Sequence, residues 1–454
     1  MRIVHLPLII SVLQKRHTLR GHDRLLPEQI QRIQHRKLAE LRQFAYSRSG
    51  FYQQFHKGLF DKPLSELPSL SKSDYLAHFN EISTDSRLRL HALESYMKQM
   101  AVDDLYLGRY WLMSTSGSTG KNAVFVYDKT EWAVALASYM CCNDFAGVKT
   151  NFFGKTRLAI IGSKTPWHQS ARVGHDMAVR TVPRLRLDAT DPVRENIDRL
   201  NEFQPTVLVT YPSVMEQILE ELRLGRVQFK PLAVLLTAEP SSPALRQEMS
   251  ARWGVEGFDC YGATETGVIA AECAAHKGLH VRDDLLIVEN VDEKNQPVPP
   301  GELGSKILVT SLFSRTLPLI RYEITDCVRF SRSRCECGRP YGLIEEIQGR
   351  RADFLRFPAP DGSRVTVHPN TFKSLLEPEA VEAWQVIQRS DGLHLRLARP
   401  RAGFSPDRLE TKIQNELARQ GSVSQKISIE IMDEIPRGPT GKLLLIVNQN
   451  NTSV

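Results

Sequence analysis

The feature that most constrains the fold is an alternation of short apolar runs and helical segments in the middle of the chain. Buried strands are expected at residues 158–161, 207–210, 234–236 and 258–261, and helices at 191–203, 213–224 and 243–253. This alternation predicts a parallel sheet with helical crossovers. In open sheets of this kind, ligands bind at the loops that follow the carboxyl ends of the strands. We therefore expect one site built from several of these loops.

The segments after the apolar runs have the composition of such loops. They are Tyr211-Pro212-Ser213, Thr237-Ala238-Glu239-Pro240 and Gly262-Ala263-Thr264-Glu265-Thr266. Their side chains are polar or turn-forming, so they can supply both ligand contacts and sharp changes of chain direction.

A second unit is expected after a break near residue 349. It has strand-like runs at 383–387, 393–397 and 427–431 and a helical segment at 406–419. We therefore predict an α/β protein with a large N-terminal domain at 1–348, led by a basic helical segment over about residues 1–100. A small α+β domain follows at 349–454.

Positive charge is concentrated at the start of the chain. The formal net charge is +7, and residues 1–60 hold eleven Lys and Arg against three Asp and Glu. Residues 25–57 carry apolar side chains at helical spacing between basic ones, which predicts a basic amphipathic helix. Because the rest of the chain is nearly neutral, we expect no nucleic-acid partner. The helix either covers the large domain with a solvated face or docks an anionic acceptor, a carrier protein or a membrane surface.

Composition excludes several other classes of protein. Of the 454 residues, 41% are hydrophobic and 24% charged, which is typical of a globular chain rather than a disordered one. The longest apolar stretch, residues 6–13, contains Pro7 and Ser11 and is too short for a transmembrane segment. It lacks a small-residue cleavage site, so we do not expect a signal peptide. An odd number of cysteines, seven, indicates a reducing compartment and a cytoplasmic protein.

One loop has the composition of a phosphate-binding segment. Ser114-Thr115-Ser116-Gly117-Ser118-Thr119-Gly120-Lys121 holds five hydroxyls, two glycines and a lysine. Glycines let the backbone approach a ligand closely, and hydroxyls, backbone N–H groups and the ammonium donate to phosphate oxygens. The spacing differs from the Walker type. Strand-like residues at 111–113 and 123–126 flank the loop and argue against the alternative, a flexible linker.

Together with four later segments, this loop resembles the adenylate-forming superfamily of acyl-CoA ligases and related enzymes. Those segments are Tyr261-Gly262-Ala263-Thr264-Glu265, Arg321 to Asp326, Gly349-Arg350 with Asp353, and Gly441-Lys442-Leu443. Their order and gaps are similar to those of the family over nearly the whole chain. Residues 38–55, the turn at 211–213 and the short C-terminal part look most like phenylacetate-CoA ligases and related capsular-polysaccharide proteins.

The resemblance implies a two-step reaction with ATP, Mg²⁺ and coenzyme A. A carboxylic acid, expected to be aromatic, attacks the α-phosphate of ATP to give an acyl-adenylate, and a thiol then displaces AMP. Lys442, Thr264 and Glu265 would be catalytic, with Glu265 as the Mg²⁺ ligand. The Thr264 hydroxyl would reach the α-phosphate, and residues 114–121 would hold the β and γ phosphates. Asp326 and Arg350 would bind the ribose. The remaining nucleotide contacts, around the adenine, would come from Ala238, Glu239, Pro240, Tyr261 and Gly262.

The sequence also departs from the family pattern. Ala352 stands where the family hinge has aspartate, so the pivot of a mobile C-terminal domain is expected at Ala352 or Asp353. Residues 323–325 replace the usual Arg-Thr-Gly before Asp326, and Asn122 replaces a proline after the loop lysine. None of these changes removes a group that the chemistry needs.

Cysteine and histidine form a second constellation. Cys335 and Cys337 lie on a tight turn, and Cys273 lies upstream with His276 or His280. Three sulfurs and one nitrogen suit tetrahedral structural zinc. The resemblance favours His280 as the nitrogen ligand, whereas ordinary ligand spacing favours His276. Free buried cysteines are the alternative.

Several questions stay open at this stage. Trp132, Tyr139, Met140, Cys141 and Cys142 either pack in the core or line an acyl pocket. The acyl acceptor could be a carrier protein, an amine or a sugar instead of coenzyme A. A non-catalytic nucleotide-binding scaffold is a further alternative, against which the presence of Lys442 and Glu265 argues. Neither the acid nor the oligomeric state follows from the sequence.

Overall fold

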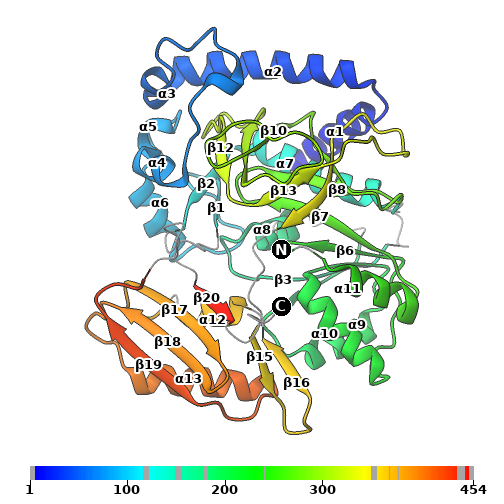
Figure 1. Ribbon diagram of the computed structural model, residues 1–454, viewed down its shortest axis with the longest axis vertical. Helices are drawn as coiled ribbons and strands as arrows, with labels where there is room; N and C mark the ends of the chain where they lie inside the picture. The colour runs from blue at the N-terminus through cyan, green and yellow to red at the C-terminus, as the bar shows by residue number, and fades with distance from the viewer. Residues whose placement is uncertain are drawn as a thin grey trace.

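The centre of the protein is a mixed sheet that contains the expected parallel strands. The computed structural model describes residues 6–115, 122–148, 156–177, 182–239, 241–348, 355–367, 369–376, 378–436 and 445–448. In it, nine strands lie side by side in one sheet (Figure 1). Their order is β13 (Cys327–Phe330), β14 (Leu343–Gln348), β9 (Leu279–Val281), β8 (Gly267–Glu272), β7 (Gly257–Ala263), β6 (Ala233–Thr237), β5 (Val207–Thr210), β3 (Leu158–Gly162) and β4 (Arg184–Asp188).

The parallel half confirms the strands and crossovers expected from the apolar runs. Strands β4, β3, β5, β6 and β7 are parallel. The crossover helices are α8 (Gln169–Asp176), α9 (Val193–Phe203), α10 (Pro212–Arg223) and α11 (Pro243–Glu248), the last continued by a π-helical turn at Met249–Trp253. Edge strand β4 was not predicted, because its leucines alternate with arginines and give no continuous apolar run.

The other half of the sheet is antiparallel, which the sequence analysis did not predict. Strand β7 pairs with β8 through a hairpin, and β8, β9, β14 and β13 continue the antiparallel order. Two smaller sheets pack nearby. One pairs β1 (Trp111–Ser114) with β2 (Val124–Tyr127), and the other contains β10 (Leu286–Val291), β11 (Lys306–Ser311) and β12 (Tyr322–Ile324).

Helix α7 (Lys129–Phe145) is buried at the core of the large domain. Asp128 caps it by accepting from the backbone of Thr130 and Glu131, and the Glu131 side chain completes the capping box. The same buried carboxylate accepts from the backbone N–H of Thr316 at 2.7 Å and from its hydroxyl at 2.6 Å. One side chain thus both starts the helix and ties it to the segment after β11.

In Figure 1 the N-terminal helices lie along the top and the upper left side of the molecule. They are α1 (Leu6–His22), α2 (Pro27–Arg48), α3 (Gly50–Phe55), α4 (Lys72–Ala77), α5 (Phe79–Ile82) and α6 (Leu90–Met97), with a 3₁₀ turn at Leu64–Glu66. The single helix expected over 25–57 is wrong in one respect. It is broken at Ser49, whose backbone is extended and whose hydroxyl caps α3 and donates to the Glu81 carbonyl at 2.8 Å.

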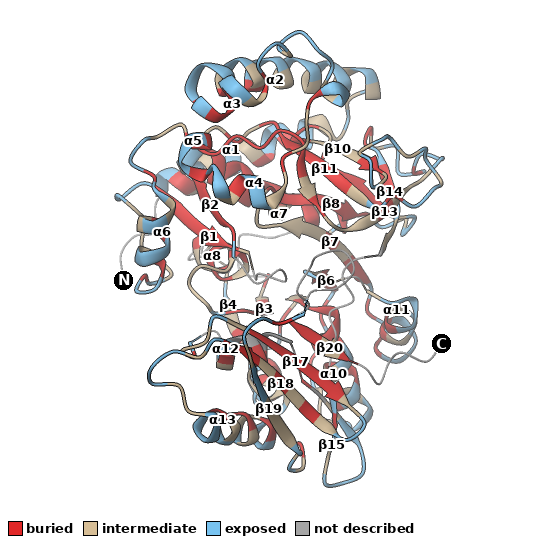
Figure 2. Ribbon diagram, turned by 60° about the vertical axis from the view of Figure 1, so that its left-hand side comes forward, coloured by how far each residue is buried: buried red, intermediate tan, exposed pale blue. Residues whose placement is uncertain are grey.

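The apolar stretch at 6–13 belongs to helix α1, which packs on α7. Leu8, Val12 and Leu19 are buried in this contact, and buried Arg16 forms an ion pair with Asp144 at 2.6 Å. Within the described residues, no helix is long and apolar enough to cross a membrane. Figure 2 shows that α2 presents an exposed face outward, whereas the strands beneath are buried.

A buried ionic cluster joins these helices to the sheet. Arg282 and Asp284 follow β9, are fully buried and pair at 2.8 Å. From α1, His22 lies 3.0 Å from the Asp284 carboxylate, and from α2, Lys37 donates to the Asp284 backbone carbonyl at 2.8 Å. The Arg282 guanidinium also lies 5.1 Å from the Tyr341 ring centroid.

The C-terminal elements have a hydrophobic core of their own. They comprise a hairpin of β15 (Leu355–Pro358) and β16 (Arg364–Val367), helices α12 (Pro369–Leu376) and α13 (Pro406–Arg419), and a sheet. The sheet order is β19 (Ile427–Met432), β18 (Gly392–Ala398), β17 (Ala383–Arg389) and β20 (Ile446–Asn448). The predicted helix at 406–419 is confirmed. Arg419 and Gln420 both donate to the carbonyl of Thr190 in the large domain, at 2.7 and 2.6 Å.

Arg282→Met should destabilise the protein strongly. The substitution leaves the Asp284 carboxylate buried without its guanidinium partner, which costs about 3–5 kcal/mol of unfolding free energy. Urea unfolding followed by circular dichroism measures the change in midpoint. Arg87→Met is the matched control, because Arg87 pairs with Asp85 at an exposed site. Equal midpoints for the two variants would contradict the role of the cluster.

Candidate functional site

The loops at the carboxyl ends of the parallel strands contact one another, as expected for a shared site. The Tyr211 hydroxyl, after β5, accepts from the backbone N–H of Ser163, after β3, at 3.1 Å. The Glu239 carboxylate, after β6, accepts from the backbone N–H of Ser213 at 3.2 Å. Ala238 has a positive φ of 69°, a conformation that a non-glycine residue rarely adopts and that is enriched at functional sites.

The turn after β7 lies next to the predicted ribose-binding aspartate. The Tyr261 hydroxyl donates to the Asp326 carboxylate at 2.8 Å, so two residues 65 positions apart are brought together. The Thr264 carbonyl accepts from the Tyr127 hydroxyl at 2.7 Å. A Cβ at Gly262 would lie 3.1 Å from the Gly267 carbonyl oxygen and 3.1 Å from the Tyr139 hydroxyl. Only glycine fits there without displacing a neighbour.

Glu265 lies near three phenols, those of Tyr75 and Tyr127, which are buried, and that of Tyr139, which is partly buried. Burial raises the pKa of Tyr127 and Tyr139 well above that of a free tyrosine, and the negative charge of Glu265 adds to the effect. Tyr75 responds in the same way, with burial again the largest cause. All three hydroxyls therefore stay neutral and can donate or accept hydrogen bonds beside the carboxylate.

The base of the predicted phosphate loop is anchored on the β1–β2 pair. The backbone N–H of Thr115 donates to the Ala123 carbonyl at 3.0 Å. In return, the Thr115 hydroxyl accepts from the backbone N–H of Ala123 at 3.0 Å. The Ser114 N–H donates to the Trp167 carbonyl at 2.9 Å, which places the loop base beside the start of α8. Lys72, the first residue of α4, lies 3.5 Å from the Thr115 hydroxyl.

Lys72 is a cation near the site that the sequence analysis missed. The serine before it, Ser71, is the N-cap of α4, and its hydroxyl accepts from the backbone N–H of Asp74 at 3.1 Å. A lysine one position after a capped helix start is common, so nothing in the sequence linked Lys72 to a loop 43 residues away.

Other predicted site residues lie outside the described part of the chain. These are Ser116, Gly117, Ser118, Thr119, Gly120, Lys121, Pro240, Arg350, Ala352, Asp353 and Lys442. Their roles, the position of the hinge and the boundary at 348/349 stay predictions.

The predicted zinc ligands come together in the antiparallel half of the sheet, from β9, the segment after β8 and the turn between β13 and β14. The ligand atoms of Cys273, His280, Cys335 and Cys337 all lie within 4.8 Å of one another. The Cys273 and Cys335 sulfurs are 3.7 Å apart, and the His280 Nε2 is 3.4 Å from Cys273 and 3.2 Å from Cys337. Ligand separations of roughly 3.5–3.8 Å are expected around tetrahedral zinc, so the donor set fits the metal.

Of the two candidate histidines, His280 lies in this cluster and His276 does not. His276 is bound elsewhere: its Nδ1 lies 2.9 Å from Glu272, and its ring stacks on Phe258. Burial and the neighbouring Arg339 and Arg282 lower the pKa of His280 to about 4, so its imidazole is neutral, as a metal ligand must be.

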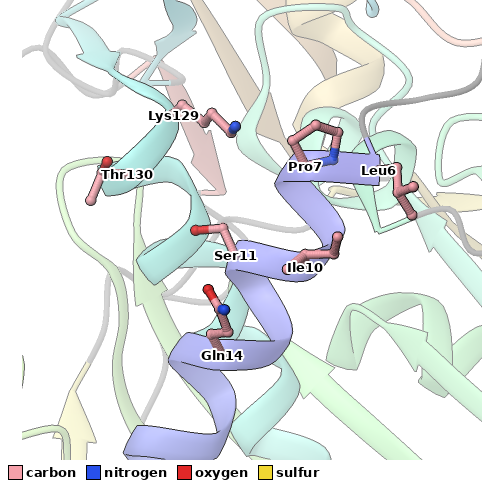
Figure 3. Close-up of a pocket in the computed structure, with 7 residues that line it drawn as sticks. All are labelled: Leu6, Pro7, Ile10, Ser11, Gln14, Lys129 and Thr130. Carbon is pink, nitrogen blue, oxygen red and sulfur yellow. The ribbon is translucent and has the colours of Figure 1, made fainter.

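A separate groove lies between α1 and the start of α7. It has a volume of about 440 Å³ and is lined by α1 and by the first turn of α7 (Figure 3). Its lining residues are Leu6, Pro7, Ile10, Ser11, Gln14, Lys129 and Thr130. None of the described site residues lines it.

Comparisons with known proteins agree with this arrangement. Residues 87–311 match the family described as AMP-binding enzyme. A phenylacetate-coenzyme A ligase of Thermus thermophilus is 24% identical over 80% of this chain and 79% of its own length. Protein CapK of Staphylococcus aureus is 22% identical over 92% of this chain and 88% of its own. A 2-hydroxyisobutyryl-CoA ligase bound to 2-HIB-AMP and CoA, 17% identical, shares the fold with a TM-score of 0.61, over 95% of this chain and 92% of its own.

The fold, the site and the family match over residues 87–311 thus agree on an enzyme similar to the adenylate-forming, AMP-forming acid–CoA ligases. Among the relatives found, it resembles phenylacetate-CoA ligases and CapK over most of its length.

Asp326→Asn should weaken ATP binding through the ribose. A neutral amide replaces the carboxylate that Tyr261 holds, so we expect the KM for ATP to rise about 10-fold or more. The measurement is acid-dependent release of pyrophosphate at varied ATP. With 2′,3′-dideoxy-ATP, the variant and the parent should have similar KM values, because the ribose hydroxyls are missing. Asp103→Asn, at an exposed position, is the control. An equal defect with both nucleotides would contradict ribose recognition.

Proposed function

We propose that this protein activates a carboxylic acid with ATP to an acyl-adenylate and transfers the acyl group to a thiol, most favourably that of coenzyme A. The observation that carries the proposal is the contact between Tyr261 and Asp326 beside the Thr264–Glu265 turn. It joins the expected adenine and ribose contacts to the expected metal and α-phosphate contacts at one edge of the sheet. The named activities of the relatives support the same reaction.

The residues divide the work of the first step. Asp326 would accept from the ribose hydroxyls, and Thr264 would reach the α-phosphate. A Mg²⁺ ion held by Glu265 would neutralise phosphate charge; a carboxylate among neutral phenols is a suitable oxygen ligand for this ion. Lys442 would bridge the two anions that must approach each other, and Lys72 adds positive charge at the base of the phosphate loop.

The acyl acceptor has two candidates. Coenzyme A is favoured by the several relatives named phenylacetate-coenzyme A ligase. An acceptor other than a thiol is the second candidate: an amine, a sugar or a carrier protein. The similarity to a fumarate–(S)-2,3-diaminopropanoate ligase, which is 22% identical, supports an amine among these. AMP release that requires coenzyme A would select the first candidate, and AMP release that requires another acceptor would select the second.

We also propose that the C-terminal elements act as a mobile lid pivoting at Ala352 or Asp353. Their separate hydrophobic core supports a unit that can move as a body. Such a motion would break the hydrogen bonds of Arg419 and Gln420 to Thr190. A cytoplasmic location is proposed as well. It is supported by the seven cysteines, all in the described residues, none of which forms a disulfide.

Lys442→Ala should abolish adenylate formation and spare the second half-reaction. Carboxylate-dependent exchange of pyrophosphate into ATP should fall at least about 100-fold, because no cation then bridges the acid and the α-phosphate. Thioester formation from a supplied acyl-adenylate should change little. Lys426→Ala, which alters an exposed lysine of the same domain, is the control. Exchange at the parental rate in Lys442→Ala would refute the assignment of Lys442, and no exchange with any acid in a broad panel would revive the scaffold alternative.

We further propose that Cys273, His280, Cys335 and Cys337 hold a structural zinc ion. Four protein ligands leave no open coordination position, so the ion would join the start of β9 to the turn before β14 and take no part in the reaction. The buried Nδ1 of His280 has no hydrogen-bond partner among the described residues, whereas its Nε2 faces the sulfurs.

Metal analysis of the purified protein tests the zinc proposal. We expect about one equivalent of zinc in the parent, and less than half an equivalent in His280→Ala and Cys337→Ser. His276→Ala and Cys327→Ser are matched controls that should retain the metal, because neither side chain belongs to the cluster. Less than half an equivalent in the parent, prepared without chelators, would contradict the proposal.

A further inference from the structure

Gln169 is a buried amide with one half of its hydrogen-bonding capacity unused. It is the first residue of α8 and only 9% exposed. Its Oε1 accepts from the Tyr139 hydroxyl at 2.8 Å, whereas its Nε2 has no partner among the described residues. Leaving such a group unpaired in the interior is unfavourable, because it loses its hydrogen bond to water and gains none from the protein. Because buried polar groups are nearly always paired, this exception requires an explanation.

The amide lies next to the site where the acid must react. Tyr139, which holds it, has its hydroxyl 3.1 Å from the Cβ position of Gly262, on the turn that carries Thr264 and Glu265. On the other side, the residues just before Gln169 meet the base of the phosphate loop through the bond from Ser114 to Trp167. Gln169 thus lies between the segment that would reach the α-phosphate and the base of the predicted phosphate loop.

Tyr139 fixes the amide but leaves one atom for a ligand. A tyrosine hydroxyl can donate to Oε1 or accept from Nε2, so turning the amide over only changes which atom is left unpaired. Because the residue is almost fully buried, a ligand group that reaches it is removed from water. A hydrogen bond made there discriminates strongly, since an analogue without the group leaves the amide unpaired.

We propose that Gln169, positioned by Tyr139, recognises a hydroxyl group on the acyl part of the substrate, so that the protein activates a hydroxylated carboxylic acid in preference to its hydrocarbon parent. The inference rests on the proposed function and names the class of acid. A hydroxyl suits either orientation of the amide, because it both donates and accepts. An aromatic acid with a hydroxyl on the ring or side chain meets this requirement and the expectation of an aromatic substrate.

The contacts of α7 bear on whether its predicted candidate residues pack in the core or line an acyl pocket. Cys141 and Cys142 are buried in the core, and Trp132 donates from its indole N–H to the buried carboxylate of Asp176 at 2.7 Å. Tyr139 alone of these predicted candidates forms a hydrogen bond to an amide beside the β7 turn. The predicted segment therefore contributes mostly core, with one polar contact to the acyl side of the site.

The test compares matched acids in two assays. Phenylacetate is paired with mandelate and with 4-hydroxyphenylacetate, and benzoate with 2-hydroxybenzoate. Calorimetric titration, with a non-hydrolysable ATP analogue present, measures binding, and pyrophosphate exchange measures activation. In the parent protein, at least one hydroxylated acid should bind about 10-fold or more tightly than its partner without the hydroxyl, and should support exchange that is faster by a similar factor. Gln169→Leu should reduce that ratio to about one by weakening only the hydroxylated acid, and Tyr139→Phe should reduce it in part.

Each outcome bears on one claim. Gln99→Leu, at an exposed position after α6, is the control and should keep the parental ratio, and thermal melting of all variants checks that they fold. A hydroxyl preference in binding that Gln169→Leu removes, without any exchange, would support the inference and refute the proposed reaction. Exchange with no hydroxyl preference in the parent, or with a preference that Gln169→Leu retains, would overturn the inference alone. Equal losses for both members of every pair would also overturn it, because Gln169 would then contact the reacting carboxylate.

Discussion

The ion pair between Arg282 and Asp284 is the constraint on which much of the large domain depends. Both side chains are removed from water, which is tolerable only because further groups contact them: His22 and Lys37 from the N-terminal helices, Asp23 from the turn between these helices, and the ring of Tyr341. The pair lies directly after β9, two residues from His280. The antiparallel half of the sheet, the basic helices and the candidate zinc ligands therefore share one anchoring point.

This anchoring explains part of the charge at the start of the chain. Lys37 reaches into the cluster, Arg16 is buried against Asp144, and Arg42 donates to the carbonyls of Leu59 and Lys62. These basic side chains hold the helices to one another and to the sheet. The exposed positions of α2, such as Arg32 and Arg36, remain as a solvated face, which is the plainer of the two uses expected from the sequence.

Sequence periodicity predicted the parallel half of the sheet well, because those strands are buried on both faces and form continuous apolar runs. It failed where a strand is not apolar on both faces, and where a hydrogen bond between residues distant in sequence determines where a helix ends. Strand β4 alternates arginine and leucine, and the break at Ser49 depends on the Glu81 carbonyl. Motif order located Tyr261, Thr264, Glu265 and Asp326. The partners that shape the site, Lys72, Tyr127 and Gln169, have no motif and are recognisable only from their neighbours in space.

Strand β7 pairs parallel with β6 on one side and antiparallel with β8 on the other. This position limits which loops around the site can change in length. Residues 264–266 form a turn whose two ends are already paired, Ala263 with Gly267 and Gly262 with Val268. An inserted residue there would shift the register of β8 and turn its buried side chains to the opposite face. The connections after β3, β5 and β6 lead into helices and can change length without that penalty. Changes in substrate range should therefore arise in those connections, around Gln169 and Tyr211, while the length of the turn that carries Thr264 and Glu265 stays constant.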